Sequence, residues 1–262
     1  MRFKSVKEIE DYAIEILGIP YVKFDGLEPE VCSEIIEGLS ICFNRYPALK
    51  NALCAIGDTK YINEQYNLVN SSMNVKKIKW DDDFLQDEGE LLNAISVGNH
   101  RLLIKDKKVI ELWEYIAISY KDELRNKTLT ELEKNSKYGA ETGYFTKSSI
   151  SFFSKIIHEI GHILDFIMNL SHTKEFVELI GTNVETFQKN ISEYSTNSVS
   201  DILAEAFTEY ILSPNPNDLV KSIGTFIDEK YKKYEHSKIF NVNHRYKRHL
   251  IEDTDKKIKQ TR

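Results

Sequence analysis

The segment at residues 155–167, KIIHEIGHILDFI, contains the letters HEIGH at positions 158–162. Residues four apart on an α-helix point in nearly the same direction, so the imidazoles of His158 and His162 can approach one metal ion. Imidazole nitrogens are ordinary zinc ligands. Glu159 would stand beside the ion, where a carboxylate can accept a proton from water and return it to a leaving amine. The spacing therefore predicts one Zn²⁺ ion, two histidine ligands and a general base.

The residues around this pattern favour a buried helix. An apolar face is supplied by Ile156, Ile157, Ile160, Ile163 and Leu164. Gly161 costs about 1 kcal/mol of helix propensity relative to alanine, so we expect it to admit another backbone or a substrate at close range. The alternative is a helix that carries two surface histidines and an unrelated glutamate.

A metal site of this kind needs a third protein ligand, with the fourth position open to water. Asp201 and Glu205 are four residues apart in the segment 194–211, which is otherwise largely apolar. Carboxylates on an apolar helix are costly to bury without a partner, and a metal ion or a ligand histidine would supply one. Both acids are candidates, against the alternative of a solvated helix face. His172 would need a sharp turn to reach the same ion.

HEIGHILD, followed by Tyr194 and by the phrase DILAEAF that begins at Asp201, resembles the lethal-factor-like zinc endopeptidases. That group includes lethal-factor catalytic domains, the Pro-Pro endopeptidases and zincin domains encoded by phages and mobile elements. The motif match covers about residues 145–225, with weaker similarity over about 20–230. The N-terminal stretch 24–58 looks like that of the phage-associated members.

The resemblance implies roles for three residues. Asp201 matches the third ligand, Glu205 matches a carboxylate that supports a ligand histidine, and Tyr194 matches a tyrosine that donates to the attacking water or to the oxyanion. The family usually has glutamate at the ligand position, and aspartate is one methylene shorter, so Glu205 stays an alternative ligand. The family also has a substrate-lining segment before the active helix, where this chain has Tyr144 and Phe145.

A second family, the regulatory peptidases of mobile elements that cleave repressors, is partly similar. The stretch 201–214, DILAEAFTEYILSP, carries this likeness and again puts Asp201 at the ligand position. The long interval between His162 and Asp201 fits the lethal-factor-like layout better. Both resemblances imply the same metal site and the same reaction.

The pattern along the chain predicts an α+β fold that is mainly helical, and the resemblance implies a zincin with a small sheet beside the HEIGH helix. We expect a helical part at 1–110, a catalytic domain at 111–235 and a basic tail at 236–262, of which the stretch 244–262 is frayed or helical. Within these parts the expected elements are a helix that opens on a Ser5–Glu8 capping box, a short strand at 21–26, a helix at 29–45 that buries Cys32 and Cys42, a solvated loop around 81–83, a strand at 115–119, a polar helix at 122–135, a loop at 137–144 and a long helix from Ser148.

Composition narrows the partners. The 262 residues carry 35 Lys and Arg against 41 Asp and Glu, a net charge of −6, so nucleic-acid binding is disfavoured despite HRYKRH at 244–249. No apolar run reaches the length of a membrane span. The three cysteines form no CxxC pair and the first residues are charged, which favours the cytoplasm, with signal-independent export or virion association left open.

These observations together favour a zinc-dependent metalloendopeptidase that hydrolyses a protein or peptide substrate and is associated with a phage or mobile element. The alternatives are a catalytically silent, zinc-stabilised structural or binding module, for example in a virion, and a repressor-cleaving regulatory peptidase. The sequence specifies neither a cleavage site nor an oligomeric state.

Overall fold

The computed structural model describes residues 3–70, 94–105, 108–120, 122–181 and 183–248. Helices dominate this part of the chain, and its strands form one four-stranded sheet. The α+β class with a mainly helical content is therefore confirmed.

The elements follow one another as a helical N-terminal third, a hairpin and a second helical part. The bounds are α1 (Val6–Glu15), β1 (Tyr21–Val22), α2 (Pro29–Arg45), η1 (Pro47–Asn51), β2 (Ala55–Asp58), α3 (Thr59–Asn70), β3 (Ala94–Lys105), β4 (Lys108–Tyr120), η3 (Asp122–Asn126), α5 (Leu129–Thr142), α6 (Phe153–Met168), α7 (Lys174–Ile180), α8 (Val184–Asn190), η4 (Tyr194–Thr196), α9 (Val199–Leu212), α10 (Asp218–Tyr234) and η5 (Lys238–Phe240).

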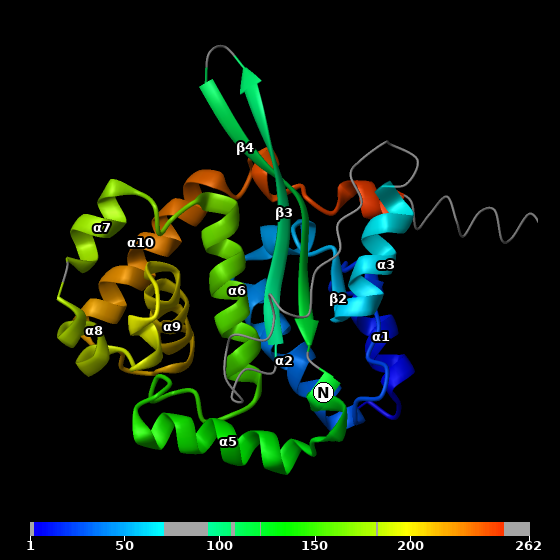
Figure 1. Ribbon diagram of the computed structural model, residues 1–262, viewed down its shortest axis with the longest axis horizontal. Coiled ribbons are helices and arrows are strands. Elements are labelled where there is room, and N and C mark those ends of the chain that lie inside the picture. The colour runs from blue at the N-terminus through cyan, green and yellow to red at the C-terminus, as the bar shows by residue number, and fades with distance from the viewer. Residues whose placement is uncertain (1–2, 71–93, 106–107, 121, 182, 249–262) are drawn as a thin grey trace, which may run out of the picture.

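The sheet has the strand order β1-β2-β4-β3. β1 pairs with β2 and β2 with β4 in parallel, whereas β3 and β4 form an antiparallel hairpin that extends past the rest of the fold (Figure 1). The strand predicted at 115–119 lies within the longer β4, and the one predicted at 21–26 covers only two residues. Because strands from both sides of residue 110 share this sheet, that residue marks no break in the layers; the domain division stays a prediction.

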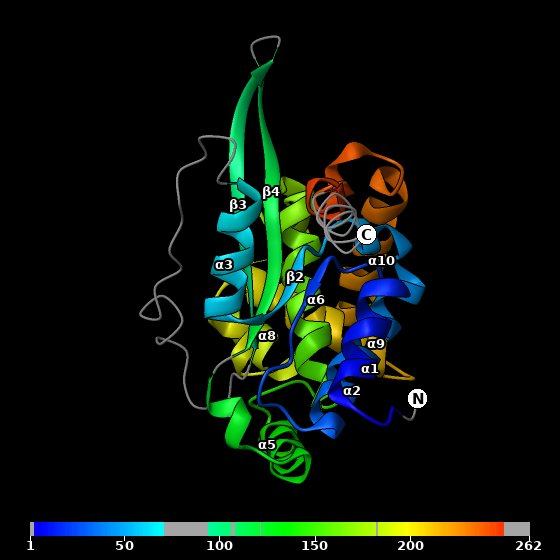
Figure 2. The same ribbon diagram turned by 90° about the vertical axis from the view of Figure 1, so that its right-hand side faces the viewer.

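Helix α6 is the central element. It lies between the sheet and the group formed by α7, α8, α9 and α10, and it contacts α2, α9, β3 and β4 (Figures 1 and 2). The predicted helix at 29–45 is confirmed as α2, with Cys32 and Cys42 buried and free among its apolar side chains. Packing on several sides explains why α6 is apolar around most of its circumference.

Two glycines set how closely other elements approach α6. A Cβ added to Gly161 would lie 2.8 Å from the Cα of Ala204 on α9 and 3.3 Å from Cδ1 of Phe207. A Cβ added to Gly38 on α2 would lie 2.8 Å from the carbonyl oxygen of Phe153. The expectation that Gly161 admits another backbone is confirmed, and that backbone belongs to α9.

The loop predicted at 137–144 is wrong, because α5 continues to Thr142 and ends at Gly143 with a φ of 79°. The polar helix predicted at 122–135 begins later than expected. The short 3-10 helix η3 comes first, and a Thr128–Glu131 capping box then starts α5. Gly139 lies within the helix, and the ring of Phe145 packs where a Cβ of residue 139 would lie. Only one of the two glycines therefore ends the helix.

The long helix predicted from Ser148 begins at Phe153 instead. The backbone N–H of Thr146 donates to Glu205 Oε2 at 3.0 Å, and that of Ser148 donates to Glu209 Oε2 at 3.0 Å. These amides bind carboxylates of α9, so they are held outside the helix that follows them.

The sequence pattern predicted none of β2, α3 and β3, which lie between residues 55 and 105. The first helix begins as expected, with the Ser5 hydroxyl accepting from the Glu8 N–H, although the Glu8 carboxylate accepts from Lys4 rather than from Ser5. The expected loop around 81–83 lies outside the described residues.

The described part of the C-terminal stretch, 236–248, is packed against the rest of the fold, and residues 244–248 are helical, which is one of the two expected outcomes. Phe240, Val242 and Tyr246 are buried, and the Asn243 amide donates to the carbonyl oxygens of Lys50 and Leu53, both at 2.9 Å. These contacts tie residues near the end of the chain to the region between α2 and β2. In the described segments, no helix combines the length and the apolar character that crossing a bilayer requires.

We predict that Gly161→Ala destabilises the protein by about 1–3 kcal/mol although alanine favours a helix, because the added methyl forces α6 and α9 apart. The same separation should weaken metal binding. Denaturant unfolding and a zinc-competition titration measure the two effects.

Gly181→Ala is the control. Gly181 has a φ of 67° and open space beside it, so its substitution strains the backbone far from α6. It should lower stability and leave zinc affinity unchanged. Equal zinc affinity in Gly161→Ala and the natural chain would contradict the account.

Candidate metal centre

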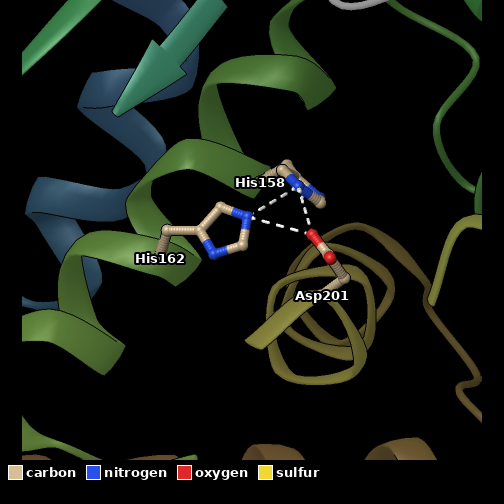
Figure 3. Close-up of side chains that lie close together, drawn as sticks. All are labelled: His158, His162 and Asp201. Atoms are coloured by element: carbon tan, nitrogen blue, oxygen red, sulfur yellow. Dashed lines mark hydrogen bonds and ion pairs between the residues drawn. The ribbon is translucent and has the colours of Figure 1, made fainter. Parts of the chain in front are cut away.

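Two helices converge on one point between their side chains. His158 and His162 lie one turn apart on α6, and their Nε2 atoms are 3.0 Å apart. Asp201, in the first turn of α9, places Oδ1 3.4 Å from His162 Nε2 and 4.0 Å from His158 Nε2 (Figure 3). The three residues can hold a metal ion, as the spacing of the sequence pattern predicted.

The spacing of these three atoms fits a small divalent ion. Ligands placed about 2.0–2.1 Å from a tetrahedral zinc lie about 3.3–3.4 Å from one another. The separations of 3.0, 3.4 and 4.0 Å scatter around that value. Two imidazoles and a carboxylate form a donor set that zinc accepts, with room for a fourth ligand.

A hydrogen-bonded chain orients His162. Its Nδ1 lies 2.9 Å from the Ser200 hydroxyl, which donates to Asp165 Oδ2 at 2.7 Å. Asp165 also accepts from the Ser171 N–H. Because the Ser200 proton is committed to Asp165, its oxygen accepts from His162 Nδ1–H, and Nε2 is left with a lone pair that faces the metal position.

Glu205 serves the other histidine. Its Oε1 lies 2.8 Å from His158 Nδ1, on the opposite side of the ring from the Nε2 that faces Asp201. Its Oε2 accepts from the Ser192 hydroxyl at 2.8 Å and from the Thr146 N–H. Glu205 therefore lies where a carboxylate supports a ligand histidine, and the geometry favours Asp201 as the third ligand.

The ionisation of these groups follows from their partners. Burial disfavours the Asp201 carboxylate, but the attraction between the carboxylate and His162 and the hydrogen bond from the Ser198 hydroxyl outweigh burial and lower the pKa of Asp201. Burial likewise opposes the charge on Glu205, and its contact with His158 outweighs burial and lowers the pKa. Burial also disfavours charge on His162, yet Asp201 raises its pKa. Both carboxylates are thus held in the anionic form that binds a cation.

The remaining predicted residues surround this centre. Glu159 is buried on α6 directly after His158. Tyr194 is buried in η4, with its ring centroid 5.6 Å from that of His158 and 5.7 Å from that of Phe145. The Tyr194 N–H donates to the Tyr144 carbonyl oxygen at 2.9 Å, so the segment before α6 lies against η4.

Sequence reasoning missed several supporting residues. These are Asp165, Ser192, Ser198, Ser200 and Glu209. Asp165 follows His162 by three residues and Ser200 directly precedes Asp201, so their spacing could have suggested a role. Nothing local marks Ser192, because its contact with Glu205 depends on how η4 packs on α9.

We predict that Ser200→Ala weakens zinc binding by about tenfold, because His162 loses the contact that fixes its tautomer. The measurement is competition with a chromophoric chelator. Ser222→Ala, on the exposed face of α10, is the matched control and should bind zinc as the natural chain does. An unchanged affinity in Ser200→Ala would show that this chain of contacts does not orient the ligand.

Comparisons with protein-family models, with curated proteins and with solved structures find no match to this chain. The assignment of a function therefore depends on the chemistry of the residues described above.

Proposed function

We propose that the protein is a zinc-dependent metalloendopeptidase of the zincin type. The observation that carries the proposal is the convergence of His158, His162 and Asp201 with Glu159 buried directly beside the first histidine. A purely structural zinc site has four protein ligands, whereas a catalytic one has three and an open position. The three candidate ligands among the described residues match the second pattern.

Bound zinc would polarise a peptide carbonyl and lower the pKa of water at the open position. Glu159 would take a proton from the attacking water and deliver it to the leaving amine, as a general base and then an acid. The Tyr194 phenol would donate to the oxygen that gains charge in the transition state. Asp165, Ser200 and Glu205 would keep the two imidazoles in place during these steps.

The substrate in this proposal is a peptide segment of a protein. Tyr144 is partly exposed beside the centre. The centroid of its ring lies 4.9 Å from the ring centroid of Phe145 and 5.7 Å from that of Tyr194. Phe145 is only 2% exposed, so it would support the wall of the substrate site from behind. Tyr144 is the residue that would touch the substrate.

We predict that Glu159→Gln lowers peptide hydrolysis by about 10²–10⁴-fold while zinc stoichiometry and thermal midpoint stay near those of the natural chain. The amide keeps the shape of the side chain and cannot accept the proton. Cleavage of a broad peptide library by the zinc-loaded protein is the assay, and Glu178→Gln on exposed α7 is the control.

Undiminished cleavage by Glu159→Gln would rule out its role as the base. A zinc-loaded natural chain that cleaves no member of the library would favour the other interpretation, a metal-stabilised binding module without turnover.

We predict that Tyr194→Phe lowers kcat by about 100-fold with little change in KM, because the lost hydroxyl acts on the transition state rather than on bound substrate. Tyr138→Phe is the control, since Tyr138 is 64% exposed on α5. A rise in KM at constant kcat would instead make Tyr194 a substrate-binding residue.

A further inference from the structure

Lys155 is a buried lysine that the proposed reaction does not use. It lies on α6 three residues before His158, and only 6% of it is exposed. Its ammonium group lies over the ring of Phe145, the residue that packs against Tyr194. Burial of an ammonium group is costly unless nearby negative charge compensates it.

That negative charge comes from the metal centre itself. Lys155 and Glu159 are four residues apart on α6 and so share one face of the helix, and the charges of Glu205 and Glu159 favour the ammonium form of Lys155 against burial. With Asp165 and Asp201 the centre holds four carboxylates, each buried. Among the lysines and arginines whose burial the structure describes, Lys155 is the one that is buried.

We propose that Lys155 is a positioning residue that balances the carboxylates of the centre in the metal-free protein and thereby weakens its affinity for zinc. The inference rests on the metal site of the proposed function and adds a means of setting how tightly that site holds its ion. A cation next to the carboxylates stabilises them when the ion is absent. The same cation repels a divalent ion when it arrives.

Loss of the Lys155 charge should change stability without metal and affinity for zinc in opposite directions. This distinguishes a charge effect from the loss of packing. Removal of the charge leaves the carboxylates of the metal-free protein without a buried cation, so stability without metal falls. Removal also ends the repulsion of zinc, so affinity for zinc rises. A side chain that only filled space would lower both stability and affinity when shortened or replaced.

The test compares Lys155→Met, Lys155→Arg and the natural chain at pH 6.5. Burial lowers the pKa of the Lys155 amine to about 7, against the pull of Glu205 and Glu159, so most of the amine is protonated at this pH. Chelator competition measures zinc affinity, and thermal unfolding is followed in EDTA and in excess zinc. Lys230→Met, on α10 in an ion pair with Glu175, is the matched control.

We expect Lys155→Met to bind zinc about tenfold more tightly, to unfold at a lower temperature in EDTA and to gain more stability from zinc than the natural chain. Lys155→Arg should resemble the natural chain. A Met variant that folds only with zinc is the same result in a stronger form.

Equal or weaker zinc binding by Lys155→Met overturns the inference, and so does a variant that fails to fold in both conditions. An Arg variant that behaves like the Met variant also overturns it, because charge would then not be the cause. A natural chain that binds no zinc refutes the metal site itself. The readouts are zinc affinity and unfolding temperature, so a missing peptidase activity refutes the proposed reaction and not the role of Lys155.

Discussion

The close contact between α6 and α9 is the constraint on which the centre depends. A methyl group added at Gly161 would lie 2.8 Å from the Cα of Ala204, so it would push the two helices apart. At this distance the side chains of α9 reach the histidines of α6 directly. The glycine between the two histidines therefore sets how closely the candidate ligands of α6 and α9 approach one another, although it is not itself a candidate ligand.

Three carboxylates on α9 form or support the candidate metal centre together with the histidines of α6. Asp201, Glu205 and Glu209 are spaced by four residues, so they form one stripe along the helix. The first faces the two Nε2 atoms, the second lies against His158 Nδ1, and the third accepts from the amide of Ser148. One helix face thus supplies a ligand, orients a histidine and holds the segment that precedes α6.

Because the carboxylates of the centre are buried, each of them needs hydrogen-bond partners within the protein. Three of the four carboxylates at the centre each accept a hydrogen bond from a serine hydroxyl, with Ser198 on Asp201, Ser200 on Asp165 and Ser192 on Glu205. Buried polar groups stabilise a unique arrangement only when every member has its partners. The short polar residues around η4 and the start of α9 supply those partners.

The sequence predicted those features that depend on residues close together along the chain. The HEIGH spacing, the apolar face of α6 and the helix at 29–45 follow from helical periodicity, and the structure has them. The late start of α6 could not be predicted, because the amides of Thr146 and Ser148 bind carboxylates about sixty residues further along the chain. The helical conformation of Gly139 is also missed by the pattern, which favours a loop at 137–144 and does not show that the ring of Phe145 packs beside this glycine.

Zinc K-edge X-ray absorption on the stoichiometrically loaded protein reports on the ligands of an ion bound between α6 and α9. We expect one ion per chain with two imidazole nitrogens and further oxygen ligands at about 2.0–2.2 Å. Sulfur in the coordination shell would place the ion at a cysteine, and a spectrum unchanged by replacing both His158 and His162 with alanine would contradict the site.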